Sequence, residues 1–427
     1  MENKKIKVMG FDGWTMGSRH YVRLLKAFDD VNIDLVLVHL GSWSDDTCRP
    51  KEEYIDGLLV RDISWYRKQD FKYILEAEKP DVVLFLSTET FLHRAFLRYC
   101  KQIGVPSIHL FHGLMGVIPA GDTNEAYKVN PIAQINYAFA RSVKFFKKTF
   151  LVYSLALLRT NALANDWRRF FTDLYQRGLG RDIAVPAIDS RADRCCVYTK
   201  VDLEVARIKW DYSDDEAVAV GNPDLTHFGF DESSLGNQIG ISKINDKSVV
   251  YIDSGISSHG LNFKSDDDYL DFLIQCYRHL RDSGFSLSVK VKPHPVSRFS
   301  FFRSKLKANG IEVLDNDNFQ RSLLHASACI IEPSTLSLIP CLLGMTVYRC
   351  RVGPLASLSY GEVFETYPRA KDLNSWDQLT TLLTSQRVTL QDGDATWNWI
   401  QENAGPLPAS DMPRRVADVV LDLVRKS

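Results

Sequence analysis

Two short motifs in the second half of the chain combine residue types that bind phosphate. The first is KPHP at residues 292–295, which follows an apolar run of strand length, and its prolines restrict the backbone on both sides of His294. The second is EPST at 332–335, which lies between another apolar run and a helical pattern. Lysine and histidine balance phosphate charge, while hydroxyls and free N–H groups at a helix start hold its oxygens. The residues that we expect to bind a phosphate-bearing donor are Lys292, His294, Pro295, Glu332, Ser334 and Thr335.

A small-residue loop after another predicted strand adds to this set. It is DSGISSHG at 253–260, whose glycines allow a ligand to approach the backbone closely. We expect Ser257 and His259 to meet a phosphate or a donor carboxylate, and Asp253 is eligible as a catalytic carboxylate. For all three motifs an ordinary turn or helix cap is the plainer alternative.

Further catalytic candidates follow predicted strands in the first half of the chain. Asp12 lies in the turn after the first predicted strand, at residues 6–11. It is the leading candidate for a base toward an acceptor hydroxyl or for a nucleophile, although it could simply form the turn. His112 follows the fourth predicted strand, at residues 107–111, and is a second catalytic candidate, with a capped turn as its alternative. Gly13 and Gly17 in the turn after the first strand have the spacing GxxxG, which is not a dinucleotide fingerprint, because GxGxxG is absent. The acceptor-side candidates are Ser18, Arg19 and Glu89.

The elements that position these residues alternate between strands and helices. Such alternation predicts an α/β fold with parallel, doubly wound sheets. Residues 132–177 interrupt it with a helical stretch rich in aromatic and basic side chains. We predict a Rossmann-like N-terminal domain over 1–200 with a helical insertion at about 132–177, a Rossmann-like C-terminal domain over 201–408, and a helix over 409–427 that packs back on the N-terminal domain.

The C-terminal half, over about 195–390, resembles the donor half of a GT-B glycosyltransferase. It is similar to bacterial transferases that use CMP-Kdo or CMP-sialic acid, and to glycerophosphotransferases that use CDP-glycerol. Those families hold the nucleotide and its phosphate with a His-Pro motif and a following Ser-Ser or Ser-Thr motif, matched here at 294–295 and 334–335. Gly-Asn-Pro at 221–223 and His-Gly at 112–113 also resemble GT-B enzymes, whereas Asp-Gly at 12–13 only partly matches the sialyltransferase motif that carries the base. The resemblance implies two Rossmann-like domains that face a cleft.

Composition limits the partners and the location. The formal net charge of -1 provides no overall positive potential that would attract nucleic acid. The eight cysteines show no metal-like spacing and fit a reducing cytoplasm. There is no apolar signal region and no apolar run long enough to span a bilayer, so we expect a cytoplasmic protein. Residues 136–171 combine bases with aromatics. They predict a helix that lies on the inner face of the cytoplasmic membrane, or equally one that packs on its own domain.

Together these features predict a glycosyltransferase that moves Kdo, sialic acid or a related sugar from a CMP-activated donor to a glycan or glycolipid acceptor. The product would be a bacterial surface polysaccharide such as lipopolysaccharide or capsule. No His/Asp cluster indicates a metal, and the nucleotide sugar is a substrate, so we expect no cofactor. The alternatives are a CDP-glycerol glycerophosphotransferase, an isomerase similar to the UDP-GlcNAc 2-epimerases, which share the His-Pro turn, and a non-catalytic lipid- or glycan-binding module. Asp12, Asp224 and Asp253 all stay eligible as the catalytic carboxylate.

Overall fold

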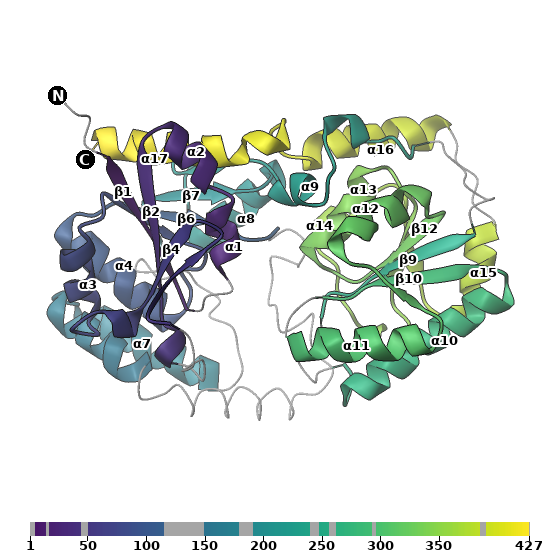
Figure 1. Ribbon diagram of the computed structural model, residues 1–427, viewed down its shortest axis with the longest axis horizontal. Coiled ribbons are helices and arrows are strands. Elements are labelled where there is room, and N and C mark those ends of the chain that lie inside the picture. The colour runs from purple at the N-terminus through teal and green to yellow at the C-terminus, as the bar shows by residue number, and fades with distance from the viewer. Residues whose placement is uncertain are drawn as a thin grey trace. The chain divides into compact units, whose positions relative to one another are not determined.

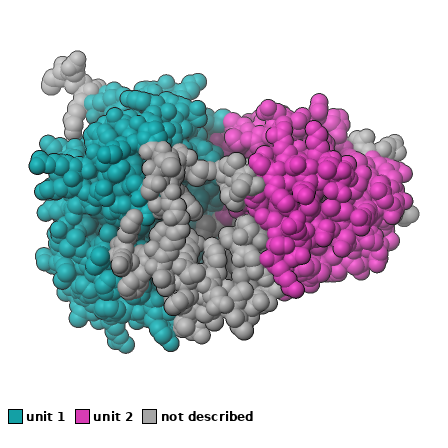
Figure 2. Space-filling model, turned by 60° about the horizontal axis from the view of Figure 1, so that its bottom comes forward, with its two compact units in different colours: residues 1–113, 137–221, 410–427 teal, residues 114–136, 222–409 magenta. Residues whose placement is uncertain are grey.

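The computed structural model describes residues 5–13, 17–43, 50–114, 149–178, 191–239, 247–255, 262–292, 296–384 and 390–426. The chain divides into two compact α/β units, coloured teal and magenta in Figure 2. The first consists of residues 1–113, 137–221 and 410–427, and the second of residues 114–136 and 222–409. The chain therefore leaves the first unit twice, after residues 113 and 221, and returns to it each time.

The first unit is built on an eight-stranded sheet with the order β3-β4-β2-β1-β5-β6-β7-β8. Neighbouring strands are parallel, except that β3 and β4 pair in antiparallel fashion. The strands are β1 (Ile6–Asp12), β2 (Ile33–His39), β3 (Glu52–Ile55), β4 (Leu58–Asp62), β5 (Val82–Phe85), β6 (Ser107–Leu110), β7 (Arg194–Val197) and β8 (Ala217–Ala219). The central strand β5 is buried along its whole length, which explains why it appears in the sequence as a continuous apolar run.

Helices cover both faces of this sheet (Figure 1). They are α1 (Ser18–Val22), α2 (Leu25–Asp30), α3 (Phe71–Glu78), α4 (Phe91–Ile103), α7 (Ala164–Gly178), α8 (Lys200–Trp210) and α17 (Met412–Lys426), and residues 149–159 are also helical. On one face Phe11 stacks on Phe96 of α4 with ring centroids 4.0 Å apart and meets Phe71 of α3 edge-on at 5.4 Å. Elsewhere in the unit α17 contacts α2 and β5, with Val416 and Val420 fully buried.

The helical insertion is fixed to α4 by a buried ion pair. Arg94 of α4 donates from Nη1 to Asp173 of α7 at 2.8 Å and from Nη2 to the Tyr153 hydroxyl at 2.9 Å. Phe91 of α4 also packs against Tyr153 and Phe170, each with ring centroids 5.2 Å apart. The described part of the predicted insertion thus consists of two helices whose inner faces pack on α4.

The first unit extends further along the chain than we predicted. A boundary between residues 200 and 201 would place α8 and β8 in the second unit, but β8 pairs with β7 and belongs to the first sheet. The first unit ends at Gly221 before the chain enters the second. A short apolar strand has the same pattern in either sheet, so only its pairing partner reveals where it belongs.

The second unit contains a six-stranded, wholly parallel sheet with the order β11-β10-β9-β12-β13-β14. Its strands are β9 (Ser248–Ile252), β10 (Ser286–Lys290), β11 (Glu312–Val313), β12 (Ala328–Ile331), β13 (Val347–Cys350) and β14 (Ala370–Leu373). Its helices include α9 (Pro223–His227), α10 (Asp266–Asp282), α11 (Val296–Ala308), α12 (Asn316–His325), α13 (Leu338–Leu342), α14 (Glu362–Glu365), α15 (Trp376–Thr384) and α16 (Leu390–Asn403). Two mostly parallel sheets with helices confirm the predicted α/β, doubly wound class.

Each sheet has a switch point, where the strand order reverses. In the first sheet it lies between β1 and β5, and in the second between β9 and β12. Open α/β sheets bind ligands outside the carboxyl ends of the strands at such points. The strands before Lys292 and Glu332 are not neighbours, because β9 pairs with both β10 and β12 and lies between them.

Candidate functional site

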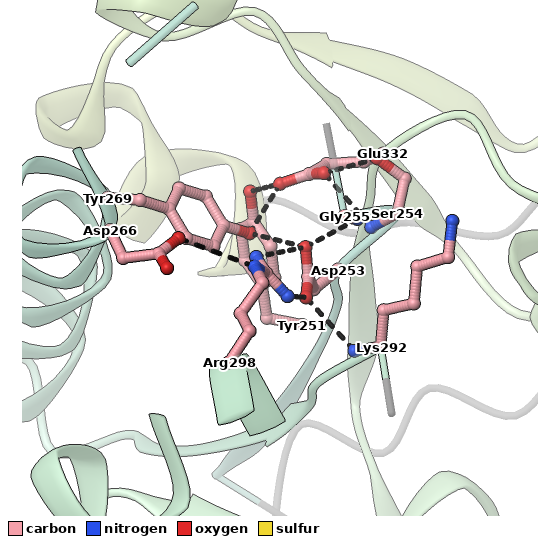
Figure 3. Close-up of polar contacts among 9 residues, drawn as sticks. All are labelled: Tyr251, Asp253, Ser254, Gly255, Asp266, Tyr269, Lys292, Arg298 and Glu332. Carbon is pink, nitrogen blue, oxygen red and sulfur yellow. Dashed lines mark hydrogen bonds and ion pairs between the residues drawn. The ribbon is translucent and has the colours of Figure 1, made fainter. Parts of the chain in front are cut away.

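Polar side chains gather where β9, β10 and β12 end in the second unit (Figure 3). The buried members of this group, which we call the Asp253–Glu332 cluster, are Tyr251, Asp253, Ser254, Tyr269, Arg298 and Glu332. The end of β9 supplies three of them, the end of β12 one, and α10 and α11 one each. Because β9 and β12 flank the switch point, the cluster lies where an open sheet binds its ligands.

Glu332 is completely buried and accepts four hydrogen bonds. Its Oε2 accepts from the N–H of Ser254 at 3.0 Å and from the Ser254 hydroxyl at 2.6 Å. Its Oε1 accepts from the hydroxyls of Tyr251 and Tyr269 at 2.7 and 2.6 Å. The bonds to Ser254 cross the switch point and join the end of β12 to the loop after β9. Both carboxylate oxygens are thus satisfied, as a buried acid requires.

Asp253 joins the loop after β9 to the loop after β10 and to α11. Its Oδ2 accepts from Nη1 of Arg298 at 2.8 Å and from the N–H of Lys292 at 3.0 Å. Its Oδ1 accepts from the N–H of Gly255 at 2.7 Å and from Nη2 of Arg298 at 3.3 Å. The side chains of Asp253 and Arg298 are 0% and 2% exposed, respectively. A catalytic role for Asp253 stays a prediction, and these contacts favour a role in holding the loops.

The cluster contains two carboxylates for one guanidinium. The hydroxyl of Tyr269 lies 2.6 Å from Glu332 and 3.2 Å from Asp253, yet it has a single hydrogen to donate. Burial and, second, the charge of Asp253 raise the pKa of Glu332. Burial and the same charge also raise the pKa of Tyr269, so its hydroxyl stays protonated and remains a donor.

Lys292 lies at the solvent-exposed edge of the cluster. Figure 3 shows its ammonium group pointing away from Asp253. Its stem passes close over Gly255, because a Cβ at residue 255 would lie only 2.5 Å from Lys292 Cδ. Gly255 also has a φ of +79°, which side chains other than glycine rarely adopt. The loop after β9 therefore needs glycine at this position both for its backbone and for the path of the lysine.

The predicted phosphate residues Ser334 and Thr335 are half-buried at the end of β12. The Ser334 hydroxyl accepts from the N–H of Ser337 at 3.3 Å, which is an ordinary cap of the short 3-10 helix Thr335–Ser337. The Thr335 hydroxyl accepts from the N–H of Leu114 at 3.2 Å. The Ser334 hydroxyl also lies 3.0 Å from the Ser337 hydroxyl, which donates its single hydrogen to the carbonyl oxygen of Glu332 at 2.6 Å, so Ser334 is the donor in that contact. The Thr335 hydroxyl hydrogen can be donated to a ligand, since its contact with Leu114 uses only the oxygen.

Four predicted donor-site residues lie outside the described residues: His294, Pro295, Ser257 and His259. Their contacts therefore stay predictions. The described residues on either side of them, Gly255, Lys292 and Arg298, all belong to or border the Asp253–Glu332 cluster.

A second candidate group lies at the switch point of the first sheet. Asp12 ends β1, is buried, and accepts a hydrogen bond from the N–H of Gly13 at 2.6 Å. Gly17 lies against the same carboxylate, so that a Cβ there would be 1.9 Å from Asp12 Oδ2. Burial and, second, the charge of Asp12 raise the pKa of Tyr21, which keeps that hydroxyl protonated. The carboxylate is therefore held in one position against the β1–α1 turn.

His112 follows β6 in the same unit, and its catalytic role stays a prediction. Its Nδ1 lies 2.8 Å from the carbonyl oxygen of Leu86, just after β5. That contact assigns the hydrogen to Nδ1 and leaves the lone pair on Nε2. His112 is partly solvent-accessible, but the surrounding protein lowers its pKa, so the ring is neutral near pH 7. The rings of His112 and His20 meet edge-on with centroids 5.8 Å apart.

The acceptor-side candidates also lie around these strand ends. Ser18 is buried at the start of α1, whereas Arg19 is exposed and donates from Nε to His20 Nε2 at 3.2 Å. Glu89 follows β5 and forms an ion pair with Lys209 of α8 at 2.9 Å. Asp12, Glu89 and His112 thus follow three neighbouring strands of the first sheet.

Sequence reasoning missed Tyr251, Tyr269 and Arg298 as members of a site. The two tyrosines are hidden in apolar patterns of a strand and a helix. Arg298 could have been found, because it is the one charged residue among aromatic side chains in residues 296–302, and such an arginine needs a buried acid as partner. Its partner could not have been identified, since Asp253 is 45 residues away in the sequence.

Two further observations concern the described parts of the chain. They contain no group of three or more His, Cys, Asp or Glu side chains arranged to hold a metal ion. Among the helices that they form, none is both long enough and apolar enough to cross a membrane.

Sequence comparison identifies no relatives: no protein-family model matches the chain, and no curated protein matches it significantly. Solved structures do match it in three dimensions. The wall teichoic acid polymerase TagF, soaked with CDPG, has a TM-score of 0.52 at 11% identity, over 99% of this chain and 90% of TagF. The calicheamicin glycosyltransferase CalG4 has a TM-score of 0.53 at 11% identity, over 99% of both chains.

MnaA of S. aureus, in complex with UDP, has a TM-score of 0.50 at 14% identity, over 98% of this chain and 97% of MnaA. Identities this low carry information on the fold alone. The matches nevertheless run through both units, and they agree with the two parallel-dominated sheets described above. The chain therefore has the GT-B glycosyltransferase fold.

Proposed function

We propose that the protein is a glycosyltransferase that moves Kdo or a related nonulosonic sugar from a CMP-activated donor to a lipid-linked or polysaccharide acceptor. The reaction would serve the synthesis of a bacterial surface glycan. The observation that carries the proposal is the arrangement at the switch point of the second sheet. There the ends of β9, β10 and β12 bring Lys292, Gly255 and the Ser334–Thr335 hydroxyls to one edge of the sheet.

The donor phosphate would bind at this edge. Lys292 is exposed and positively charged, and the guanidinium of Arg298 is bound to Asp253. The hydroxyl of Thr335 can donate to a phosphate oxygen, because its described contact uses it as an acceptor, whereas Ser334 would have to turn its hydrogen away from Ser337 to do so. These groups would stabilise the negative charge that develops on the leaving nucleotide as the glycosidic bond breaks. The chemistry that they offer requires no metal ion.

Asp12 is the proposed base that takes the proton from the acceptor hydroxyl. Its carboxylate is fixed by Gly13 and Gly17, and a base must be held in place to act at hydrogen-bond distance. His112 is a second candidate, since its neutral Nε2 could accept the same proton. Replacing each residue singly separates the two, because only the base itself should be indispensable to kcat while donor binding is preserved.

The test is to incubate the protein separately with CMP-Kdo, CMP-sialic acid, CDP-glycerol and UDP-GlcNAc, and to follow nucleotide release and sugar fate. Release of CMP from a CMP-sugar, stimulated by an acceptor and unaffected by EDTA, is the expected result. Turnover of UDP-GlcNAc without an acceptor would instead show an isomerase, and failure to bind any nucleotide would support a non-catalytic binding module.

A CDP-glycerol glycerophosphotransferase is the second candidate. It is supported by the similarity to TagF, a wall teichoic acid polymerase whose structure was obtained with CDPG. The same phosphate-binding groups would serve this reaction, because CDP-glycerol also loses CMP as its leaving group. Release of CMP from CDP-glycerol alone would select this candidate over the sugar transferase.

Peripheral contact with the cytoplasmic face of the membrane is part of the proposal. The outer side of the helical insertion exposes Leu151, Leu155 and Leu158 on one helix, and Phe171 and Tyr175 on α7. The spacings of four and three residues place each set on one helix face. Arg168 and Arg169 of α7 lie beside them, and Asp166 and Asp173 of the same helix are bound to arginines of α4. An apolar, cationic surface of this kind fits an anionic lipid interface.

A further inference from the structure

The position of Lys292 is set by a chain of contacts that leads back to two buried acids, Asp253 and Glu332. The N–H of Lys292 is bound to Asp253, and its stem passes over Gly255, whose own N–H is also bound to Asp253. Ser254, between these residues, is bound to Glu332 through both its N–H and its hydroxyl. The backbone N–H groups of Ser254 and Gly255 therefore point to buried acids and not to a donor phosphate.

This arrangement separates two roles within the predicted donor site. The glycines of the loop after β9 allow a ligand to approach its backbone closely, but the N–H groups of Ser254 and Gly255 are already used. The described part of the loop instead provides the surface on which the aliphatic stem of Lys292 lies. The direction of the ammonium group then depends on where residues 254 and 255 are held, and that is decided by Glu332 and Asp253.

We infer that Glu332 and Asp253 are positioning residues that direct the ammonium group of Lys292 to the donor phosphate through the Ser254–Gly255 loop. The inference rests on the proposed function, because it assigns a phosphate-bearing ligand to Lys292. Glu332 acts from β12 and Asp253 from β9, so the two acids set the loop from both sides of the switch point. Tyr251 and Tyr269 hold the other oxygen of Glu332, which leaves it one orientation.

The function of Glu332 in this arrangement depends on its hydrogen bonds more than on its charge. A glutamine can present its carbonyl oxygen to Ser254 and its amide nitrogen to the two tyrosine hydroxyls, whose oxygens can accept. Glu332→Gln therefore preserves the four contacts, whereas Glu332→Ala removes them all. The pair of variants separates loss of the contacts from loss of the carboxylate.

The experiment measures binding of CMP and of cytidine to the full chain by titration calorimetry, with the melting temperature recorded in parallel. Lys292→Met should weaken CMP binding about tenfold or more and leave cytidine binding unchanged, because only the phosphate contact is lost. Glu332→Ala and Gly255→Ala should reduce the preference for CMP over cytidine to a similar extent. Glu332→Gln should stay within about threefold of the unmodified chain, since its contacts are kept.

Gly310→Ala is the matched control for Gly255→Ala. Gly310 has the same φ of +79° and lies in the turn between α11 and β11, so its substitution adds similar backbone strain elsewhere in the unit. It should lower the melting temperature without changing the preference for CMP.

Three results would overturn the inference or the function beneath it. A normal CMP preference in Glu332→Ala and Gly255→Ala, with a weakened one in Lys292→Met, would refute the positioning role alone. An equal loss of preference in Gly310→Ala would show that the effect is general strain, which also refutes it. If the unmodified chain does not bind CMP, the proposed function fails and the inference fails with it.

Discussion

Replacing Leu151, Leu155 and Leu158 with glutamine should weaken binding of the protein to lipid vesicles. These side chains lie on one face of the helix at 149–159, opposite the buried Tyr153 and Leu157. They are 62%, 38% and 65% exposed, so the apolar surface available to a lipid interface is large for one short helix. Because the face points away from the core, the substitutions should leave the free energy of unfolding almost unchanged.

The expected magnitude follows from these exposed fractions. Complete burial of a leucine side chain is worth about 2 kcal/mol, and weighting by exposure gives about 3 kcal/mol for the three together. That energy corresponds to an approximately 100-fold weaker partition coefficient. It is an upper estimate, since an interface removes less water than a protein core does.

The assay is cosedimentation with vesicles of phosphatidylethanolamine and phosphatidylglycerol at low and high salt. The matched control replaces Tyr54, Ile103 and Ile208, which are 73%, 39% and 58% exposed at scattered positions of the same unit. It removes a similar apolar area and should bind vesicles as the unmodified chain does. Equal loss in both triple variants, or no binding by the unmodified chain at either salt concentration, would refute the membrane surface.

Three further predictions concern the first unit. Gly17→Ala should lower kcat about 100-fold with little change in melting temperature, because its Cβ displaces the carboxylate of Asp12, and a normal kcat would exclude Asp12 as the base. Arg94→Met should lower the free energy of unfolding by about 3–5 kcal/mol in urea titrations, because it leaves Asp173 buried without its partner, and a cost below 1 kcal/mol would contradict this. Burial lowers the pKa of His93 to about 4, from about 6.5 in the unfolded chain. The unfolded state therefore binds more protons than the folded state between these pH values, and the free energy of unfolding should fall by about 3 kcal/mol as the pH drops from 6.5 to 4. His93→Leu should reduce that pH dependence by the same amount in urea titrations at a series of pH values, and an unchanged dependence would assign it to other groups.

The sequence was informative about the strands that are buried on both faces. Val82–Phe85 and Ala328–Ile331 have apolar residues at every position, because helices cover both sides of a parallel sheet. The hairpin strand Glu52–Ile55 was missed, since its residues are exposed or half-buried and no apolar run marks it. Its place at the edge of the sheet explains that pattern, because an edge strand has less surface to bury.

The site was predictable only as far as single motifs can indicate. Lys292 and Glu332 were identified because each directly follows an apolar strand, where α/β proteins place ligand-binding residues. That β9 separates their strands depends on pairings between distant segments, which the local pattern does not contain. The hydrogen bonds between Glu332 and Ser254 could not be predicted for the same reason, since 78 residues separate the two in the sequence.

The return of the chain to the first unit has a consequence for biosynthesis. A ribosome releases the segments of the first unit in three portions, which are separated by residues 114–136 and 222–409 of the second unit. Helix α17 supplies the buried residues Val416, Val420 and Leu423 of the first unit, so that core stays incomplete until α17 has been translated. The second unit, whose last segment ends at residue 409, is available for folding earlier. The nascent first unit thus exposes the apolar surface that α17 later covers, and it is the part of the molecule that most needs chaperone protection during synthesis.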